Sequence, residues 1–560
     1  MNDLISPRLR HRVRTLSTIL GETMTRQHGQ KFLSKVEEIR LLAKANRQSA
    51  IDPENSDQGD HEQLRQVLTK LDGESLISVA RAFNQFLNLT NIAEQAESTE
   101  TAIGSQLEEL FTRLINKGID QQRVVETIIS MRCDLVLTAH PTEITRRTLI
   151  QKYNRIASAL NDVNEDQELD TQERLDLERL IAEVWFTDEI RTEKPTPQDE
   201  AKWGYAVIEH SLWTAIPQLW NRLSELTFKV TGETLPLSVS PIKISSWMGG
   251  DRDGNPNVTA DVTKEILRLA RWMAADLYLR DVEELLSQLS MSNCSSELAA
   301  LCPEGVDEPY RHILRSLRER LVATRTWAET SEPPEPGLIH SDTDLIAPLQ
   351  LCYDSLLLCG MNIIADGLLK ETLIRANTFG VTLVELDIRQ SSDKHIELLD
   401  AITEYLELGS YRHWSEKART DFLLQELKTR RPLVPDSWQP EGDAGEILKT
   451  FRLIAEDNGQ GIASYIISMA RRPSDVLGVV LLLRKSGVTR VLPVVPLFET
   501  LDDLENAAWT LECLLRTNWY TEYIDGSQQI MIGYSDSAKD AGQMAASWAQ
   551  YRAQEELVVV

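Results

Sequence analysis

Apolar residues recur at helical spacing through most of the first 130 residues. Phe32–Arg47 and Glu62–Leu71 carry apolar positions every three or four residues, which is typical of amphipathic helices. Between them, Ile51–His61 is acidic, has almost no apolar residue and predicts a linker. Residues 1–130 are therefore expected to form an N-terminal helical region.

From residue 131 onward, short apolar runs interrupt this helical pattern. Each run has the length of a buried strand, and most are followed by polar residues. Helical segments such as Val262–Ser290 separate the runs. The six strand candidates are Cys133–Ala139, Ile242–Met248, Val381–Ile388, Val476–Leu483, Val491–Phe498 and Gln529–Tyr534.

Repeated strand–loop–helix units predict parallel strands, and an eight-stranded β/α barrel is the architecture that closes them. Six candidates leave such a barrel two strands short. The predicted fold class is α/β: a predominantly helical protein around an incomplete TIM-type barrel, with residues 131–560 forming the barrel and its long helical insertions. The chemistry of such a barrel lies on the loops that follow the strands.

The charge of the chain narrows the classes of partner. The formal net charge is −27, from 59 basic and 86 acidic residues, which argues against nucleic acid as a partner. A small anionic substrate remains compatible, because a basic cleft can lie within an acidic molecule. No run of 18 apolar residues predicts a membrane span, and the six cysteines lack metal-binding spacing. We expect a cytoplasmic protein with reduced thiols.

Two of the predicted strand ends carry residues suited to substrate chemistry. The first strand leads to His140, which could transfer a proton near neutral pH, although a structural histidine is the alternative. The second leads to Trp247 and the glycine-rich turn Gly249–Pro256, where backbone can approach a ligand closely. A tight charged turn with internal ion pairs is the alternative for that segment.

Further charged residues follow the later strands. Arg389 could clamp a phosphate or carboxylate, or instead pair with Asp387 or another neighbour. Glu499 and Asp536 are carboxylates at adjacent strand ends, with Lys539 nearby, and two oxygen ligands completed by water suit Mg²⁺. Two solvated loop carboxylates are the alternative.

Taken together, the motifs give a specific resemblance. They are VLTAHPTE (136–143), SWMGGDRDGNPNVT (246–259), ELDIRQ (385–390), YIISMARRPSDVLGVVLLL (465–483), VPLFETLDDLENA (495–507) and GYSDSAKDAG (533–542). In this order they closely resemble phosphoenolpyruvate carboxylase of the bacterial type. The similarity runs from the N-terminus to about residue 556.

The resemblance implies a carbon–carbon lyase that joins bicarbonate to phosphoenolpyruvate and gives oxaloacetate and phosphate. It further implies Mg²⁺ or Mn²⁺ as cofactor and a homotetramer. By the same resemblance, the catalytic residues are His140 as the base and Lys539, the substrate-binding residues are Arg389 and Trp247, and the metal ligands are Glu499 and Asp536.

The resemblance departs from the family at the C-terminal end. The chain ends at Ala553–Val560, where family members continue with a Phe-His-Gly-Arg-Gly-Gly loop, the last barrel strand and the region that binds the inhibitor aspartate. We expect an interrupted or partial reading frame, and a chain that is inactive and poorly soluble alone. Two alternatives stay open: a non-catalytic fragment that docks with a C-terminal piece or full-length subunits, and another metal-dependent enolate enzyme on a related barrel.

Overall fold

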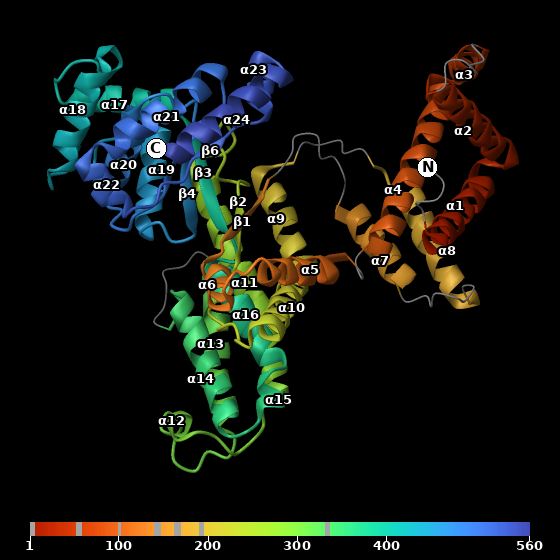
Figure 1. Cartoon of the computed structure of the whole chain (residues 1–560), viewed down its shortest axis with the longest axis horizontal. Coiled ribbons are helices and arrows are strands. Elements are labelled where there is room, and N and C mark those ends of the chain that lie inside the picture. Colours follow the sequence, from red (N-terminus) through yellow and green to blue (C-terminus); the bar gives the residue numbers. More distant parts are fainter. Residues whose placement is uncertain are drawn as a thin grey trace. The chain divides into compact units, whose positions relative to one another are not determined.

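The computed structural model describes residues 6–51, 59–98, 102–138, 147–161, 170–189, 195–330 and 337–560 (Figure 1). Within it the chain forms two compact units. The first comprises Met1–Gly118 and His140–Lys194, and the second Ile119–Ala139 and Pro195–Val560. The predicted domain boundary at residue 130 stays a prediction, because a compact packing unit need not coincide with a domain.

The first unit is helical in every element that the structure describes. Its helices are α1 (Pro7–His28), α2 (Gln30–Ile51), α3 (Gly59–Thr69), α4 (Gly73–Ser98), α5 (Ala102–Asn116), α7 (Arg147–Asn161) and α8 (Thr171–Trp185). Helices α2 and α3 confirm the two amphipathic segments predicted from the sequence. The predicted linker falls mostly on residues 52–58, outside the described residues.

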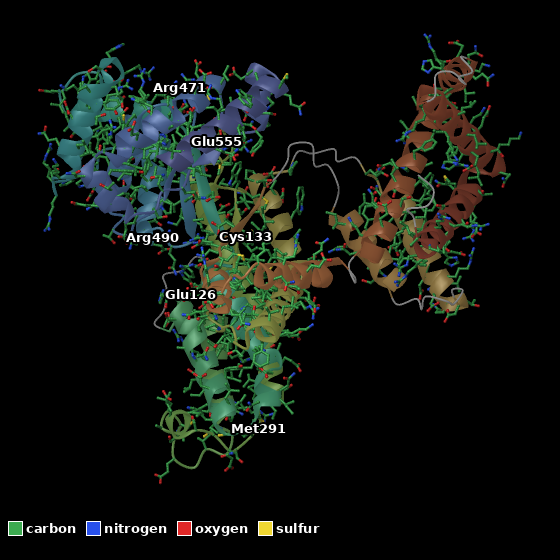
Figure 2. The ribbon with its side chains drawn as sticks, in the orientation of Figure 1. Glu126, Cys133, Met291, Arg471, Arg490 and Glu555 are labelled. Atoms are coloured by element: carbon green, nitrogen blue, oxygen red, sulfur yellow. The ribbon has the colours of Figure 1, made fainter. Side chains whose placement is uncertain are left out.

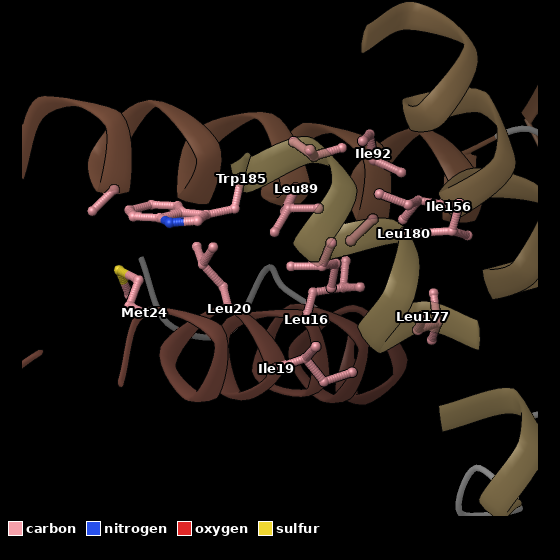
Figure 3. Close-up of a cluster of buried hydrophobic side chains, with 14 of the residues drawn as sticks. Leu16, Ile19, Leu20, Met24, Leu89, Ile92, Ile156, Leu177, Leu180 and Trp185 are labelled. Atoms are coloured by element: carbon pink, nitrogen blue, oxygen red, sulfur yellow. The ribbon is translucent and has the colours of Figure 1, made fainter. Parts of the chain in front are cut away.

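The core of the first unit lies where these helices meet. Leu16, Leu20 and Met24 from α1 pack against Leu89 of α4 and Trp185 of α8 (Figure 3). Apolar residues at helical spacing create one such face on each helix, and burying these faces together stabilises the bundle. The predicted helical character of the N-terminal region is therefore confirmed where the structure describes it.

The second unit is built around a parallel sheet. Among the described residues the sheet has six strands, and each strand pairs with the next one in sequence. The strands are β1 (Cys133–Leu137), β2 (Ile242–Ser246), β3 (Glu385–Ser391), β4 (Ile462–Ser468), β5 (Val494–Phe498) and β6 (Met531–Ile532). Sequential parallel pairing places all six carboxyl ends at one edge.

Helices connect these strands and make up most of the second unit. They are α6 (Gln121–Ser130), α9 (Pro197–Val207), η2 (Ile208–Leu212), α10 (Trp213–Thr231), α11 (Ala260–Gln288), α12 (Ser296–Ala299), α13 (Pro309–Thr330), α14 (Asp342–Leu358), α15 (Asn362–Ala365), α16 (Leu368–Phe379), η3 (Gly380–Thr382), α17 (Ser392–Tyr405), η4 (Tyr411–His413), α18 (Glu416–Leu427), α19 (Gly442–Glu456), α20 (Pro473–Ser486), α21 (Leu501–Leu515), α22 (Asn518–Ile524), α23 (Ser535–Ala541) and α24 (Gln543–Val559). No helix among the described residues is both long and apolar enough to cross a lipid bilayer.

The sheet is curled, with one concave face. A cavity of about 470 Å³ is lined by residues from all six strands, including Asp134 of β1, Asp387 of β3 and Met531 of β6. The first and last strands can line one cavity only if the sheet curves around it. The predicted architecture of a mainly helical protein around a curled parallel sheet is confirmed.

One predicted strand was wrong. Val476–Leu483 lies within helix α20, and the strand at this place in the sheet is β4 (Ile462–Ser468), which the sequence reading missed. Every residue from Pro473 to Leu483 is buried, so an uninterrupted apolar run fits either a helix or a strand. Pro473 in the first helical turn and Gly487 at the C-cap are the signals that favour the helix.

The predicted burial of the first strand was also wrong. Leu135 and Val136 of β1 remain 42% and 38% exposed. In the described part of the chain β1 pairs only with β2, so it is an edge strand. An apolar run predicts a strand, but its position in the sheet decides how much of it is covered.

Candidate active site

The candidate residues gather where β2, β3, β5 and β6 end. Trp247 follows β2, Arg389 lies near the end of β3, and Glu499 directly follows β5. Asp536 lies in the first turn of α23, just after β6. The predicted base His140 lies outside the described residues.

The turn after β2 docks on the end of β3 through backbone contacts. Arg389 N donates to Gly250 O and Arg252 N donates to Arg389 O, both at 3.0 Å, so Asp251 forms a parallel bridge with Arg389. A Cβ atom on Gly250 would lie 2.0 Å from Asp387 O. Only glycine permits this approach, which explains one glycine of the Gly-Gly pair.

Arg389 is held by Asp251 and Trp247, and Asp253 Oδ2 lies at the longer distance of 4.0 Å from its Nη2. Its Nε and Nη2 donate to the two carboxylate oxygens of Asp251, each at 2.7 Å, and its guanidinium lies 4.6 Å from the Trp247 ring centroid. Burial acts to lower the pKa of Arg389, but the Asp251 carboxylate outweighs it and the pKa is raised. The residue is thus a fixed cation, and no partner for Nη1 occurs among the described residues, so this group could meet an anion.

Trp247 is oriented from its other side by a buried carboxyl. Its Nε1 donates to Asp387 Oδ2 at 3.1 Å, and Ser464 Oγ donates to Asp387 Oδ1 at 2.5 Å. Burial raises the pKa of Asp387. The predicted alternative was a salt bridge from Arg389 to Asp387 or to a neighbour; the neighbour Asp251 forms it, while Asp387 accepts from Trp247 instead.

Glu499 is a buried carboxyl at the end of β5. Met469 N donates to its Oε1 at 3.0 Å, and Met469 has a positive φ of 55°. A positive φ is strained in a residue other than glycine, so packing around β4 must hold this N–H in place. The pKa of Glu499 is raised by burial and then by the negative charges of Asp253 and Asp536, while Arg389 and the Met469 N–H oppose the shift.

Asp536 is brought beside this carboxyl by a close backbone turn. Gly533 N donates to Phe498 O at 2.9 Å, and a Cβ atom on Gly533 would lie 2.7 Å from Glu499 Cβ. Asp536 itself is exposed, and its Oδ1 accepts from Lys539 Nζ at 2.8 Å. That hydrogen bond raises the pKa of Lys539. The turn therefore places one exposed carboxylate–ammonium pair next to one buried carboxyl.

These carboxylates fit a hard, oxygen-preferring ion such as Mg²⁺ or Mn²⁺ better than a metal that prefers nitrogen or sulfur ligands. No group of three His, Cys, Asp or Glu at metal-binding distance occurs in the described ranges. Mg²⁺ commonly takes one or two protein carboxylates and completes its octahedron with water and substrate oxygens. The mutual repulsion that helps raise the Glu499 pKa is a strain that a divalent cation would relieve.

Other arginines near the sheet are already engaged. Arg471, after β4, donates to Asp503 at 3.2 Å, and Arg490 donates to the carbonyl of Ile462. Figure 2 shows these two arginines at opposite ends of the strands. Arg389 is also paired, with Asp251, but its Nη1 has no partner among the described residues and remains a donor for an anion.

Sequence reasoning missed the residues that support the candidates. Asp251 was read only as part of a charged turn, and the Met469 N–H carries no signal in a side-chain pattern. The signal for Asp251 was present, because the preceding Gly-Gly pair marks a close backbone approach.

The chain matches known proteins over nearly its whole length. A family model described as phosphoenolpyruvate carboxylase matches residues 9–560. The chain is 49% identical to the phosphoenolpyruvate carboxylase of Hahella chejuensis, 50% to that of Pseudomonas aeruginosa and 51% to that of Pseudomonas fluorescens. Each match covers 99% of this chain and 64% of the relative, so the chain spans slightly less than two thirds of these relatives' length.

Proposed function

This chain belongs to the phosphoenolpyruvate carboxylase family, and we propose that it carries the metal-binding and substrate-binding part of a site that joins bicarbonate to phosphoenolpyruvate. The products would be oxaloacetate and phosphate, which makes the reaction a carbon–carbon lyase reaction. We further propose that the curled sheet belongs to an eight-stranded barrel of the TIM type. A homotetrameric state and a cytoplasmic location complete the proposal.

Each described residue has a physical task in this proposal. Arg389, fixed by Asp251, would bind a phosphate or carboxylate oxygen of phosphoenolpyruvate through its remaining N–H groups. Trp247, stacked on that guanidinium, would shape the apolar side of the pocket and keep water away. Lys539 would add a second cation near the substrate.

Glu499 and Asp536 would hold Mg²⁺ or Mn²⁺, which when bound neutralises charge that develops on the phosphoryl and enolate oxygens. His140, in the motif VLTAHPTE, would take the proton of the carboxylated phosphate intermediate. Binding the metal at Asp536 requires this carboxylate to share or release Lys539, its present partner. The lysine would then be free to turn toward the substrate.

The observation that carries the proposal is geometric. Gly533 N donates to Phe498 O at 2.9 Å, so α23, with Asp536 in its first turn, begins against the end of β5, where Glu499 follows directly; Arg389 lies at the same edge of the sheet. A phosphorylated substrate needs a metal ion and a cation that binds its anionic group close to each other. Glu499 and Asp536 would hold the metal, and Arg389 would be that cation.

Manganese binding tests the metal half of the proposal without requiring turnover. Electron paramagnetic resonance of Mn²⁺ titrated into the purified chain should show a site that Glu499→Gln and Asp536→Asn each weaken by at least about tenfold, the effect of losing one charged ligand. Glu522→Gln, an exposed change of equal charge on α22, controls for weak binding to an acidic surface. Equal binding by all four proteins would refute the assignment.

A further inference from the structure

Arg252 is a buried cation beneath the turn that holds Arg389. Only 8% of the residue is exposed. Its Nη1 donates to Gly250 O at 2.9 Å and its Nη2 to Thr263 Oγ1 at 2.6 Å. Its Nε has no hydrogen-bond partner among the described residues. A buried guanidinium with an unused donor costs free energy, so its presence calls for an explanation.

No carboxylate from the described part of the chain contacts this guanidinium directly. The charged and titratable groups around it are Tyr465 of β4, Glu446 of α19 and Asp251 of the turn itself, and they partly offset the burial that lowers the pKa of Arg252. Glu446 is engaged elsewhere, since its Oε1 accepts from Ala260 N at 2.5 Å. The hydrogen bonds of Arg252 therefore connect it to the turn and to α11, and they do not form an ion pair.

Thr263 connects Arg252 to Gly249, the other glycine of the turn. Its hydroxyl accepts from Arg252 and donates to Gly249 O at 2.7 Å. Gly249 has a φ of 82°, and a Cβ atom there would lie 2.1 Å from Ile266 Cδ1. Arg252 and Thr263 thus fix the carbonyl groups of both glycines, directly before Asp251.

We propose that Arg252 is a positioning residue. Through its hydrogen bonds to Gly250 and Thr263 it keeps the turn in the conformation in which both carboxylate oxygens of Asp251 accept hydrogen bonds from Arg389. The substrate's anionic group is then met by a guanidinium whose direction is already set. This inference rests on the proposed function only for the identity of that anion. The contacts between Asp251 and Arg389 are observed in the structure and do not depend on which anion binds.

If Arg252 only stabilised the fold, replacing it would lower the melting temperature. The positioning role predicts that the fold stays stable and that only Arg389 is loosened. Replacing a buried charge that lacks a direct counter-ion by an apolar side chain is often neutral or stabilising. Gly250 O would keep the hydrogen bond from Arg389 N, and Thr263 would keep a carbonyl acceptor. Arg252→Met should therefore leave the melting temperature nearly unchanged while it loosens Arg389.

Arg375 provides a matched control. Like Arg252 it is a buried arginine, but it pairs directly with Asp281 at 2.9 Å, lies 5.4 Å from the Trp213 ring centroid and belongs to α16. Arg375→Met should destabilise the fold and leave Arg389 unaffected. This control separates general loosening from loss of the specific hold.

The first measurement needs no ligand. Phenylglyoxal modifies free guanidinium groups, and peptide mass spectrometry gives its rate at Arg389 in the purified chain. Arg252→Met and Thr263→Val should raise that rate about threefold or more, as expected when one hydrogen bond no longer holds a conformation. Thr263→Ser, which keeps the hydroxyl, and Arg375→Met should not raise it. If Arg252→Met fails to fold, Thr263→Val tests the same contact, because it removes the hydroxyl that accepts from Arg252 Nη2.

The second measurement is calorimetric titration of phosphoenolpyruvate in the presence of Mn²⁺. Arg252→Met should weaken phosphoenolpyruvate about tenfold, the loss of one charge-assisted hydrogen bond, with Mn²⁺ affinity unchanged. An unaltered Arg389 reactivity in both variants, or an equal rise in Arg375→Met, overturns the positioning role. A parent chain that does not bind phosphoenolpyruvate counts against the proposed function alone, since Arg389 reactivity still decides the role of Arg252.

Discussion

The candidate side chains at this edge depend on neighbours for their orientation. Arg389 points where Asp251 and Trp247 allow it, and Glu499 is fixed by the backbone N–H of Met469. A charged residue that folding has already oriented loses little entropy on binding, so these contacts matter for affinity as much as the charges do. The Met469 N–H carries no signal in a motif of side chains, whereas Asp251 follows a Gly-Gly pair that marks a close backbone approach.

The raised pKa of Glu499 gives a prediction for stability. Burial makes the folded chain hold this proton more tightly than the unfolded chain does, so the ionised carboxylate costs stability at neutral pH. That cost vanishes as the pH falls through the folded pKa to below the ordinary value of a glutamate. Glu499→Gln should therefore raise the melting temperature in metal-free buffer at pH 7.5, with a gain that shrinks toward pH 4.5.

Calorimetry across this pH range checks the prediction, with Glu522→Gln as the exposed control. A gain that grows as the pH falls has the opposite sign and would contradict a raised Glu499 pKa. Adding Mn²⁺ should reverse the order of the two proteins, because only the parent keeps both of the proposed carboxylate ligands.

At the scale of elements, the parallel sheet explains how distant motifs come together. Strands that pair in sequential order bring residues 247, 389, 499 and 536 to one edge without any of them being close in sequence. The sequence allowed this to be predicted, since the apolar runs gave five of the six strands and the polar residues after them gave the edge. It did not distinguish β4 from α20, because both are buried on all sides and burial removes the periodicity that separates a helix from a strand.

The turn from β6 into α23 gives a second prediction. A methyl group on Gly533 would meet Glu499 Cβ at 2.7 Å and Glu499 Cα at 3.3 Å. Gly533→Ala should push α23 away from β5 and separate Asp536 from Glu499, at a cost of about 1–3 kcal/mol of stability. Mn²⁺ affinity should fall on the order of tenfold, as expected when a ligand is displaced by about 1 Å.

Gly73→Ala is the control, since a Cβ atom at Gly73 would meet nothing within 4 Å. Mn²⁺ titration and thermal unfolding of the two variants decide the matter. Unchanged Mn²⁺ affinity in Gly533→Ala would mean that the spacing of Glu499 and Asp536 does not depend on this turn.

At the scale of the whole molecule, each compact unit has its own core although the chain passes between them more than once. The first unit combines Met1–Gly118 with His140–Lys194, so β1 of the second unit lies between its two segments in sequence. A boundary read along the sequence cannot represent this arrangement, because helices α7 and α8 pack back onto α1 and α4 through contacts of long sequence separation. Hydrophobic periodicity reports which face of a helix is buried, and not the helix that buries it.

Separate cores predict separable stabilities. Ile156 of α7 is fully buried in the core of the first unit, so Ile156→Ala should destabilise that unit by about 2–5 kcal/mol through lost burial and a residual cavity. Ile150, on the same helix, is 38% exposed, and Ile150→Ala should cost less than about 1 kcal/mol.

Because Glu499 and Asp536 belong to the second unit, Mn²⁺ affinity at 20 °C should be the same in both variants and the parent. Calorimetry with and without Mn²⁺ tests this: the metal should raise the melting temperature of the second unit alone. A loss of Mn²⁺ affinity in Ile156→Ala, absent from Ile150→Ala, would show instead that the metal site depends on the packing of the first unit.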